Sequence, residues 1–156
     1  YLVEEAGFKY NMLDLQAAIG IHQLKRIEAY SKRRELIWNY YLKELYNYPI
    51  GLAAEIEQNT RHAFHLFILR INKKKCGISR DEFLLKMNEK KIGCGVHYKA
   101  IPQHPFYKKK FGWKEKDFNN SVAFGQETVS IPLSGTLKDI EVERIINTVK
   151  EILDGK

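Results

Sequence analysis

A helical period of apolar residues runs through the first third of the chain and constrains its fold more than any other feature. Between Met12 and Tyr46, large side chains recur at steps of three and four residues, as they do on one face of a helix. They are Leu15, Ile19, Ile27, Tyr30, Tyr40 and Leu45. Pro49 and Gly51 then end the pattern. The sequence therefore predicts a long N-terminal helix, or two helices joined by a bend near Gly20 or at Ala29–Ser31.

The residues before this helix are predicted to form a turn. Gly7 can adopt backbone conformations that are closed to other residues. Asp14 stands directly before the apolar run, where its carboxylate can cap exposed N–H groups. The chain begins with Tyr1 rather than Met, so we expect it to be part of a longer protein. Residues 1–11 are then a connection, and residues 12–156 form one small domain.

Three later segments have the pattern of strands: Ala63–Ile71, Gly95–Tyr98 and Thr128–Leu133. Both sides of the first are apolar, which is typical of a covered central strand. Pro132 places the third at an edge or near its own end. The expected sheet is three-stranded and mostly antiparallel.

The segments between the strands are predicted to be helical. Ser79 and Glu82 form a capping box that opens one helix, and Gly93 stands at its expected C-cap. Further helices are expected over residues 106–111 and 118–127 and from Thr136 onward. The predicted fold class is therefore α/β, of the two-layer α+β kind, with the sheet packed against helices.

The composition limits the possible partners. A length of 156 residues suits one domain with a sizeable core, and the net charge is +7. The basic runs Lys73–Lys75, Lys90–Lys91 and Lys108–Lys110 fall in loops and at helix ends rather than on one face with exposed aromatic residues. They indicate a solvated surface that could also attract anionic substrates. Because these runs do not share one face, we expect no nucleic-acid partner. No apolar run is long enough to span a membrane, so we expect no membrane partner.

The chain lacks the spacing of a metal site. Cys76 and Cys94 match no ligand motif, and two free thiols indicate a reducing compartment, which predicts a cytoplasmic location. The histidines His62, His65 and His104 do not have zinc spacing. Neither a glycine-rich phosphate loop nor a nucleophile elbow is present.

Several motifs occur together in one order. They are Gly-Phe-Lys-Tyr-Asn-Met from Gly7, Gln23-Leu24, Arg33-Arg34, His62-Ala63-Phe64-His65, Gly95-Val96-His97-Tyr98 and His104-Pro105-Phe106-Tyr107. In this the chain resembles the C-terminal part of the DegT/DnrJ/EryC1/StrS family, which are pyridoxal-phosphate-dependent nucleotide-sugar aminotransferases. The resemblance implies the small C-terminal domain of a fold-type-I enzyme. It also implies that the Schiff-base lysine and the carboxylate facing the cofactor's pyridinium nitrogen lie upstream, so no catalytic residue is expected here and the chain alone should be inactive.

The resemblance implies that Lys9 and Asn11 bind the cofactor. They stand where many members have the Asn and Arg of Gly-Tyr-Asn-Tyr-Arg-Met, and that Asn reaches the cofactor phosphate of the partner subunit. A homodimer is therefore implied. An ammonium group is a suitable phosphate partner. The alternative is that Lys9 is simply an exposed turn residue.

His97 and Tyr98 are the candidate substrate-binding residues. Gly93 and Gly95 precede them and allow close approach of a ligand. Neighbouring strand residues point to opposite faces, so one of the two would face the site. The resemblance places this segment beside the sugar, where an imidazole can hydrogen-bond a hydroxyl or phosphate, or relay a proton. The alternative is a packed histidine at a strand end.

The implied reaction is transfer of an amino group, with glutamate as the expected donor, to a nucleotide-linked keto-sugar in polysaccharide synthesis. Two alternatives remain open. One is a dehydratase of the same family that acts on keto-deoxysugars, in which a histidine replaces the upstream lysine. The other is a stand-alone basic domain that binds nucleic acid or another protein.

Overall fold

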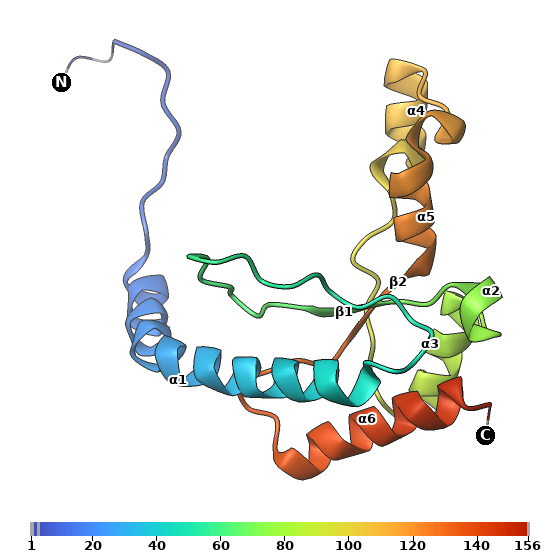
Figure 1. Cartoon of the computed structure of the whole chain (residues 1–156). Coiled ribbons are helices and arrows are strands. Elements are labelled where there is room, and N and C mark those ends of the chain that lie inside the picture. Colours follow the sequence, from blue (N-terminus) through green and yellow to red (C-terminus); the bar gives the residue numbers. More distant parts are fainter. Residues whose placement is uncertain (1, 3, 156) are drawn as a thin grey trace.

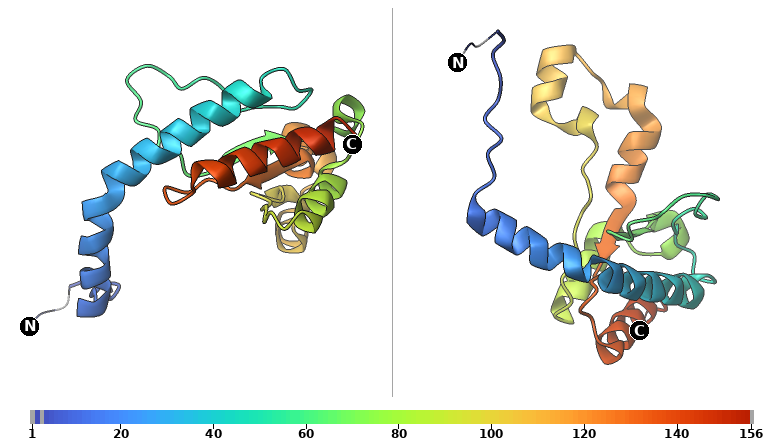
Figure 2. Two further views of the ribbon diagram at one scale, coloured as in Figure 1. Left: turned by 90° about the horizontal axis from the view of Figure 1, so that it is seen from below. Right: turned by 90° about the vertical axis from the view of Figure 1, so that its left-hand side faces the viewer.

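The computed structural model describes residues 2 and 4–155, and its longest element is the helix α1, Asp14–Leu45 (Figure 1). The predicted long helix is confirmed as one continuous element. Figure 2 shows that its N-terminal part turns away from the direction of its C-terminal part. The predicted cap was wrong by one residue, because Leu13 is the N-cap and its N–H donates to Gln16 Oε1 at 3.0 Å. Asp14 instead lies in the first turn, near the positive end of the helix dipole.

The sheet has two strands where three were predicted. Strand β1, Phe67–Arg70, pairs antiparallel with β2, Thr128–Ile131, so that Phe67 is opposite Ile131. The expected strand Gly95–Tyr98 is reduced to a single bridge: the Gly95 N–H donates to Ser130 O at 3.0 Å, and Gly95 O accepts from Ser130 N–H at 2.8 Å. Past this bridge the His97 carbonyl accepts from the Thr128 side chain, at 3.4 Å, and the His97 ring lies over Gly95 with its Nδ1 2.9 Å from Ser130 Oγ.

The first predicted strand is also shorter than expected. It begins at Phe67 rather than Ala63, because Phe64 has a φ of 47°, a left-handed conformation that an extended strand excludes. The Phe64 N–H donates to Nδ1 of His62 at 3.0 Å, which holds this turn. Arg70, the last residue of β1, forms an isolated antiparallel bridge with Gly51.

Five further α-helices complete the described fold. They are α2 Lys73–Cys76, α3 Arg80–Glu89, α4 Pro105–Phe111, α5 Asn119–Glu127 and α6 Asp139–Leu153, with 3-10 turns at Ile101–Gln103 and Glu115–Phe118. The capping box of α3 is confirmed, since Glu82 N–H donates to Ser79 Oγ at 3.2 Å and Ser79 N–H to Glu82 Oε2 at 2.8 Å. This helix ends at Glu89, not Gly93, because Lys91 takes the left-handed conformation that turns the chain.

The short helix α2 in the first lysine run was not predicted. The Asn72 side chain caps it by accepting from the N–H groups of Lys74 and Lys75, and Gly77 ends it with a φ of 71°. Such a short helix has no apolar period of its own, so only its caps could have indicated it.

The hydrophobic core lies between the ribbon of two strands and the helices α1, α3 and α6. Its largest fully buried side chains include Tyr41 and Leu45 of α1, Phe67 of β1 and Phe83 of α3. The Tyr41 hydroxyl donates to Pro132 O at 3.0 Å and so ties α1 to the end of β2. All four residues of β2 are buried, which fixes this strand firmly in the molecule.

A helical lobe, residues 101–127, projects from the other side of the ribbon, and Figure 1 shows α4 and α5 standing away from α1 and α6. The rings of Tyr107 and Trp113 stack within it at 5.8 Å. At its base the backbones pack closely, because a Cβ on Gly125 would lie 2.7 Å from the Ala100 nitrogen. The chain that leaves His97 therefore enters the lobe directly beside β2.

Candidate functional site

His97 lies where the Gly95 segment, strand β2 and the base of the lobe meet. Its Nδ1 is 2.9 Å from Ser130 Oγ, and its carbonyl oxygen accepts from Thr128 Oγ1 at 3.4 Å. A Cβ on Gly95 would lie only 2.6 Å from Cε1 of the ring, so the ring occupies the space that any other side chain would need. Sequence reasoning singled out His97 and Gly95 but missed Ser130 and Thr128, which are far away in the chain.

Tyr98 is 71% exposed, and its ring packs edge-on against that of His97 at a centroid distance of 4.8 Å. The expectation that the two side chains point to opposite faces was wrong, because the segment forms no strand beyond Gly95. The two rings instead pack on each other, the His97 ring half-buried and the Tyr98 ring exposed.

Lys9 and Asn11 lie on the exposed segment that precedes α1 (Figure 1). No hydrogen bond or ion pair joins either side chain to another described residue. Figure 1 shows that this segment runs away from the core, so the chain does not bring Lys9 and Asn11 together with His97 and Tyr98. An ammonium and an amide without partners suit the oxygens of a phosphate, but these residues could supply only one end of a cofactor site.

The pair Arg33 and Arg34 divides into a bonded and an unbonded residue. Arg33 donates to Leu137 O at 2.7 Å and to Asp139 Oδ1 at 2.6 Å. The Nε of Arg34 is buried and has no hydrogen-bond partner within the described part of the chain. Arg34 lies one turn before Trp38 on the core side of α1, where an arginine interrupts the apolar period. Such a group is suited to an anionic partner.

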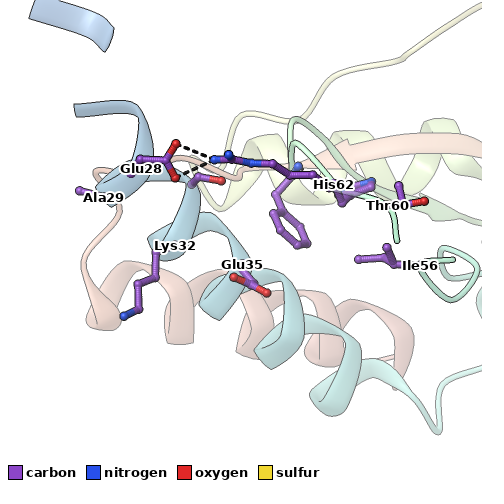
Figure 3. Close-up of a pocket in the computed structure, with 10 residues that line it drawn as sticks. Glu28, Ala29, Lys32, Glu35, Ile56, Thr60 and His62 are labelled. Atoms are coloured by element: carbon purple, nitrogen blue, oxygen red, sulfur yellow. Dashed lines mark hydrogen bonds and ion pairs between the residues drawn. The ribbon is translucent and has the colours of Figure 1, made fainter. Parts of the chain in front are cut away.

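A cavity of about 710 Å³ lies between α1 and the loop that precedes β1 (Figure 3). Arg61 and Glu28 close one side of it with contacts of 2.6 and 2.7 Å, and this pairing lowers the pKa of the Glu28 carboxyl. Glu35, Thr60 and His62 also line it. None of the four predicted site residues does, so this cavity is separate from the His97 region.

The two thiols have the character of packed residues. Partial burial raises the pKa of Cys94 to about 11 and also raises that of Cys76, so both stay protonated near neutral pH. Over residues 2 and 4–155, no three His, Cys, Asp or Glu side chains are placed to hold a metal ion. None of the helices in this same range combines the length and apolarity needed to cross a membrane.

The fold is α/β, with His97 half-buried beside β2 and the segment before α1 exposed. The chain belongs to the DegT/DnrJ/EryC1/StrS aminotransferase family, whose model matches residues 1–150. It is 40% identical over 156 residues to the spore coat polysaccharide biosynthesis protein SpsC of Bacillus subtilis, covering 99% of this chain and 40% of that protein. The chain thus spans less than half the length of this curated relative.

Solved structures show the same fold. Spr1654 from Streptococcus pneumoniae, assigned as a sugar aminotransferase, matches 93% of this chain with a TM-score of 0.83 and 28% identity, over 36% of its own length. It has been solved in apo, pyridoxal phosphate and pyridoxamine phosphate forms. DesV of S. venezuelae matches 99% of the chain and 40% of its own length, with a TM-score of 0.87 and 24% identity, which supports the fold alone.

Proposed function

We propose that this chain is the C-terminal part of a pyridoxal-phosphate-dependent sugar aminotransferase. The whole enzyme transfers an amino group from an amino acid, with glutamate as the expected donor, to a nucleotide-linked keto-sugar. The family match over residues 1–150 carries this proposal. The likeness to SpsC supports a place in polysaccharide synthesis. No comparison favours the dehydratase or the nucleic-acid-binding alternative.

The cofactor, when bound, supplies the carbonyl group that accepts the amino group and passes it on. In this proposal the Lys9 ammonium and the Asn11 amide donate to the cofactor phosphate of a partner subunit. Their exposure and lack of partners within the described residues support this role. The enzyme is then a homodimer, which acts in the cytoplasm. The residue that binds the cofactor covalently lies outside this chain, so the 156-residue chain alone is inactive.

His97 and Tyr98 bind the sugar substrate in this proposal. Ser130 and Gly95 hold the imidazole against the ribbon, while Tyr98 extends the same surface outward. An imidazole held in this way can hydrogen-bond an oxygen of the nucleotide-sugar without first losing rotamer freedom. The excess of basic residues adds long-range attraction for the anionic nucleotide-sugar.

The direct test uses the complete protein that carries this chain. It is incubated with pyridoxal phosphate, glutamate and a panel of nucleotide-linked keto-sugars, and mass spectrometry follows the amino-sugar product. We expect one keto-sugar to gain an amino group, and the 156-residue chain alone to give no product. Absence of amino transfer with every keto-sugar, or turnover by the chain alone, would contradict the proposal.

A further inference from the structure

We infer that Ser130 is a positioning residue that fixes the tautomer of His97, so that His97 presents its Nε2–H as a hydrogen-bond donor to the substrate. The inference rests on the proposed function, in which His97 contacts the nucleotide-sugar. It adds the direction of that hydrogen bond and the residue that sets it.

The backbone of Ser130 is held from both sides. On one side it lies opposite Ile68 in the ladder of β1 and β2. On the other side it exchanges two hydrogen bonds with Gly95, of 3.0 and 2.8 Å. The residue is only 4% exposed. The backbone that carries the Ser130 side chain is therefore fixed in position. The hydroxyl oxygen lies 2.9 Å from Nδ1 of His97.

Counting donors and acceptors selects the tautomer. If Nδ1 carried the proton and donated to Ser130 Oγ, the buried hydroxyl would have its own hydrogen left over, and the described residues offer that hydrogen no other acceptor. An unsatisfied buried donor is costly. If the hydroxyl donates to Nδ1 instead, both groups are satisfied. The neutral imidazole then carries its proton on Nε2.

Gly95 keeps the ring in this orientation. The position of a Cβ on Gly95 is 2.6 Å from Cε1, 3.2 Å from Nδ1 and 3.4 Å from Nε2, so this edge of the ring lies over the glycine. The described part of the chain places no hydrogen-bond partner on Nε2. The Tyr98 ring packs edge-on beside the imidazole. A side chain on residue 95 would push the ring away from Ser130.

The chemical consequence is a neutral donor at the site. An Nε2–H group fits an oxygen acceptor, such as a phosphate oxygen or the keto oxygen of the sugar. It is unsuited to accept a proton at Nε2, so His97 acts in binding and polarisation rather than as a base.

The first test reads the tautomer directly in the complete protein with ¹⁵N-labelled histidine, in mildly alkaline buffer where imidazoles are neutral. The His97→Gln spectrum identifies the His97 signals among those of the other histidines. We expect the Nε2–H form in the unaltered protein and in Ser130→Thr, which keeps the hydroxyl. We expect a mixture of tautomers in Ser130→Ala. An Nδ1–H form in the unaltered protein, or an unchanged tautomer in Ser130→Ala, would overturn the inference.

The second test follows the two half-reactions of the complete protein. We expect Ser130→Ala and Gly95→Ala each to lower kcat/KM for the nucleotide-sugar by roughly three- to tenfold, with the amino-donor half-reaction unchanged, and Ser130→Thr to restore the rate. The matched control is Thr148→Ala, which removes another buried hydroxyl, one that bonds Arg144 O on α6. Equal losses of kcat/KM in Thr148→Ala and Ser130→Ala would show that Ser130 contributes only to packing, and would overturn the inference.

The two tests separate this inference from the proposed function. If His97→Ala leaves the sugar kinetics intact, the substrate role of His97 fails, and the tautomer spectra still decide the role of Ser130. If His97→Ala impairs the sugar half-reaction while Ser130→Ala does not, the substrate role stands and the positioning role is contradicted.

Discussion

The two halves of α1 have the same apolar period and opposite environments. In the C-terminal half, Trp38 is 4% exposed and Tyr41 is fully buried against β1. In the N-terminal half, Ile19 is 55% exposed and Leu24 is 68% exposed. An apolar period thus predicts that one face of a helix packs against another surface, but it does not identify that surface. Exposed apolar area on this scale is typical of an interaction surface.

The largest effect expected from this difference concerns stability. In the 156-residue chain, Trp38→Ala should lower the free energy of unfolding by about 3–5 kcal/mol, because the indole packs on Phe64 and Phe67. Ile19→Ala should cost less than about 0.5 kcal/mol, as a surface substitution does. Denaturant unfolding measures both. Similar losses in the two variants would show that the two halves are equally covered.

The next effect concerns assembly of the complete protein. If the N-terminal half of α1 lies in the proposed homodimer, Ile19→Asp places a charge in the interface and should weaken dimerisation by about 2–4 kcal/mol. Sedimentation velocity over a concentration series measures this. Leu85→Asp, at an exposed leucine on α3, is the control and should leave the dimer intact. An unchanged dimer in Ile19→Asp would remove the N-terminal half of α1 from the interface.

A smaller effect is expected just before α1. Lys9→Ala in the complete protein should weaken binding of pyridoxal phosphate by about 1–3 kcal/mol, because a charge-assisted hydrogen bond to the phosphate is lost. Titration of the cofactor-free enzyme, followed by absorbance, gives the dissociation constant. Lys32→Ala, an exposed lysine on α1 beside the cavity, serves as the matched control. Equal affinity in the two variants would make Lys9 an ordinary surface lysine.

The core against which the C-terminal half of α1 packs should also respond to pH, because Cys94 packs against the same core. The folded chain raises the pKa of Cys94 from 9.0 to about 11, so the folded state retains this proton more strongly than the unfolded state does. Its contribution to stability is present below pH 9 and is lost as the pH rises toward 11. Burial raises the pKa of Tyr41 in the same direction, above its ordinary value of 10.0. Cys94→Ala should reduce the fall in stability between pH 9 and 11 by about 1–2 kcal/mol. An identical fall in both proteins would contradict this assignment.

Local patterns predicted the helices well and the sheet partially. The period over residues 12–46 and the Ser79 capping box are local signals, and both were confirmed. The predicted strand Gly95–Tyr98 did not form: only Gly95 pairs with β2, and the His97 ring contacts Ser130, 33 residues away, which no local pattern records. The left-handed turn at Phe64 likewise shortened β1.

The candidate site shows the same limit. Motif resemblance indicated His97 and Tyr98, and Gly95 before them. Ser130 was missed because it stands in a strand with the alternation of an ordinary core segment. Arg34 belonged to a quoted motif, but only the structure shows its Nε buried without a partner among the described residues. Ser130 and Arg34 stand out only through their tertiary environment, which local sequence patterns do not record.

The half-reactions of His97→Ala test the central claim most directly. In the complete protein, the change in the cofactor's absorbance spectrum follows each half-reaction separately. The account predicts a lower kcat/KM for the nucleotide-sugar, corresponding to a loss of about 1–3 kcal/mol of transition-state stabilisation. The reaction with the amino donor should be much less affected. His65→Ala, at an exposed histidine just before β1, should change neither. Equal losses in both half-reactions, or a loss of thermal stability with unchanged kinetics, would assign His97 to packing and contradict the account.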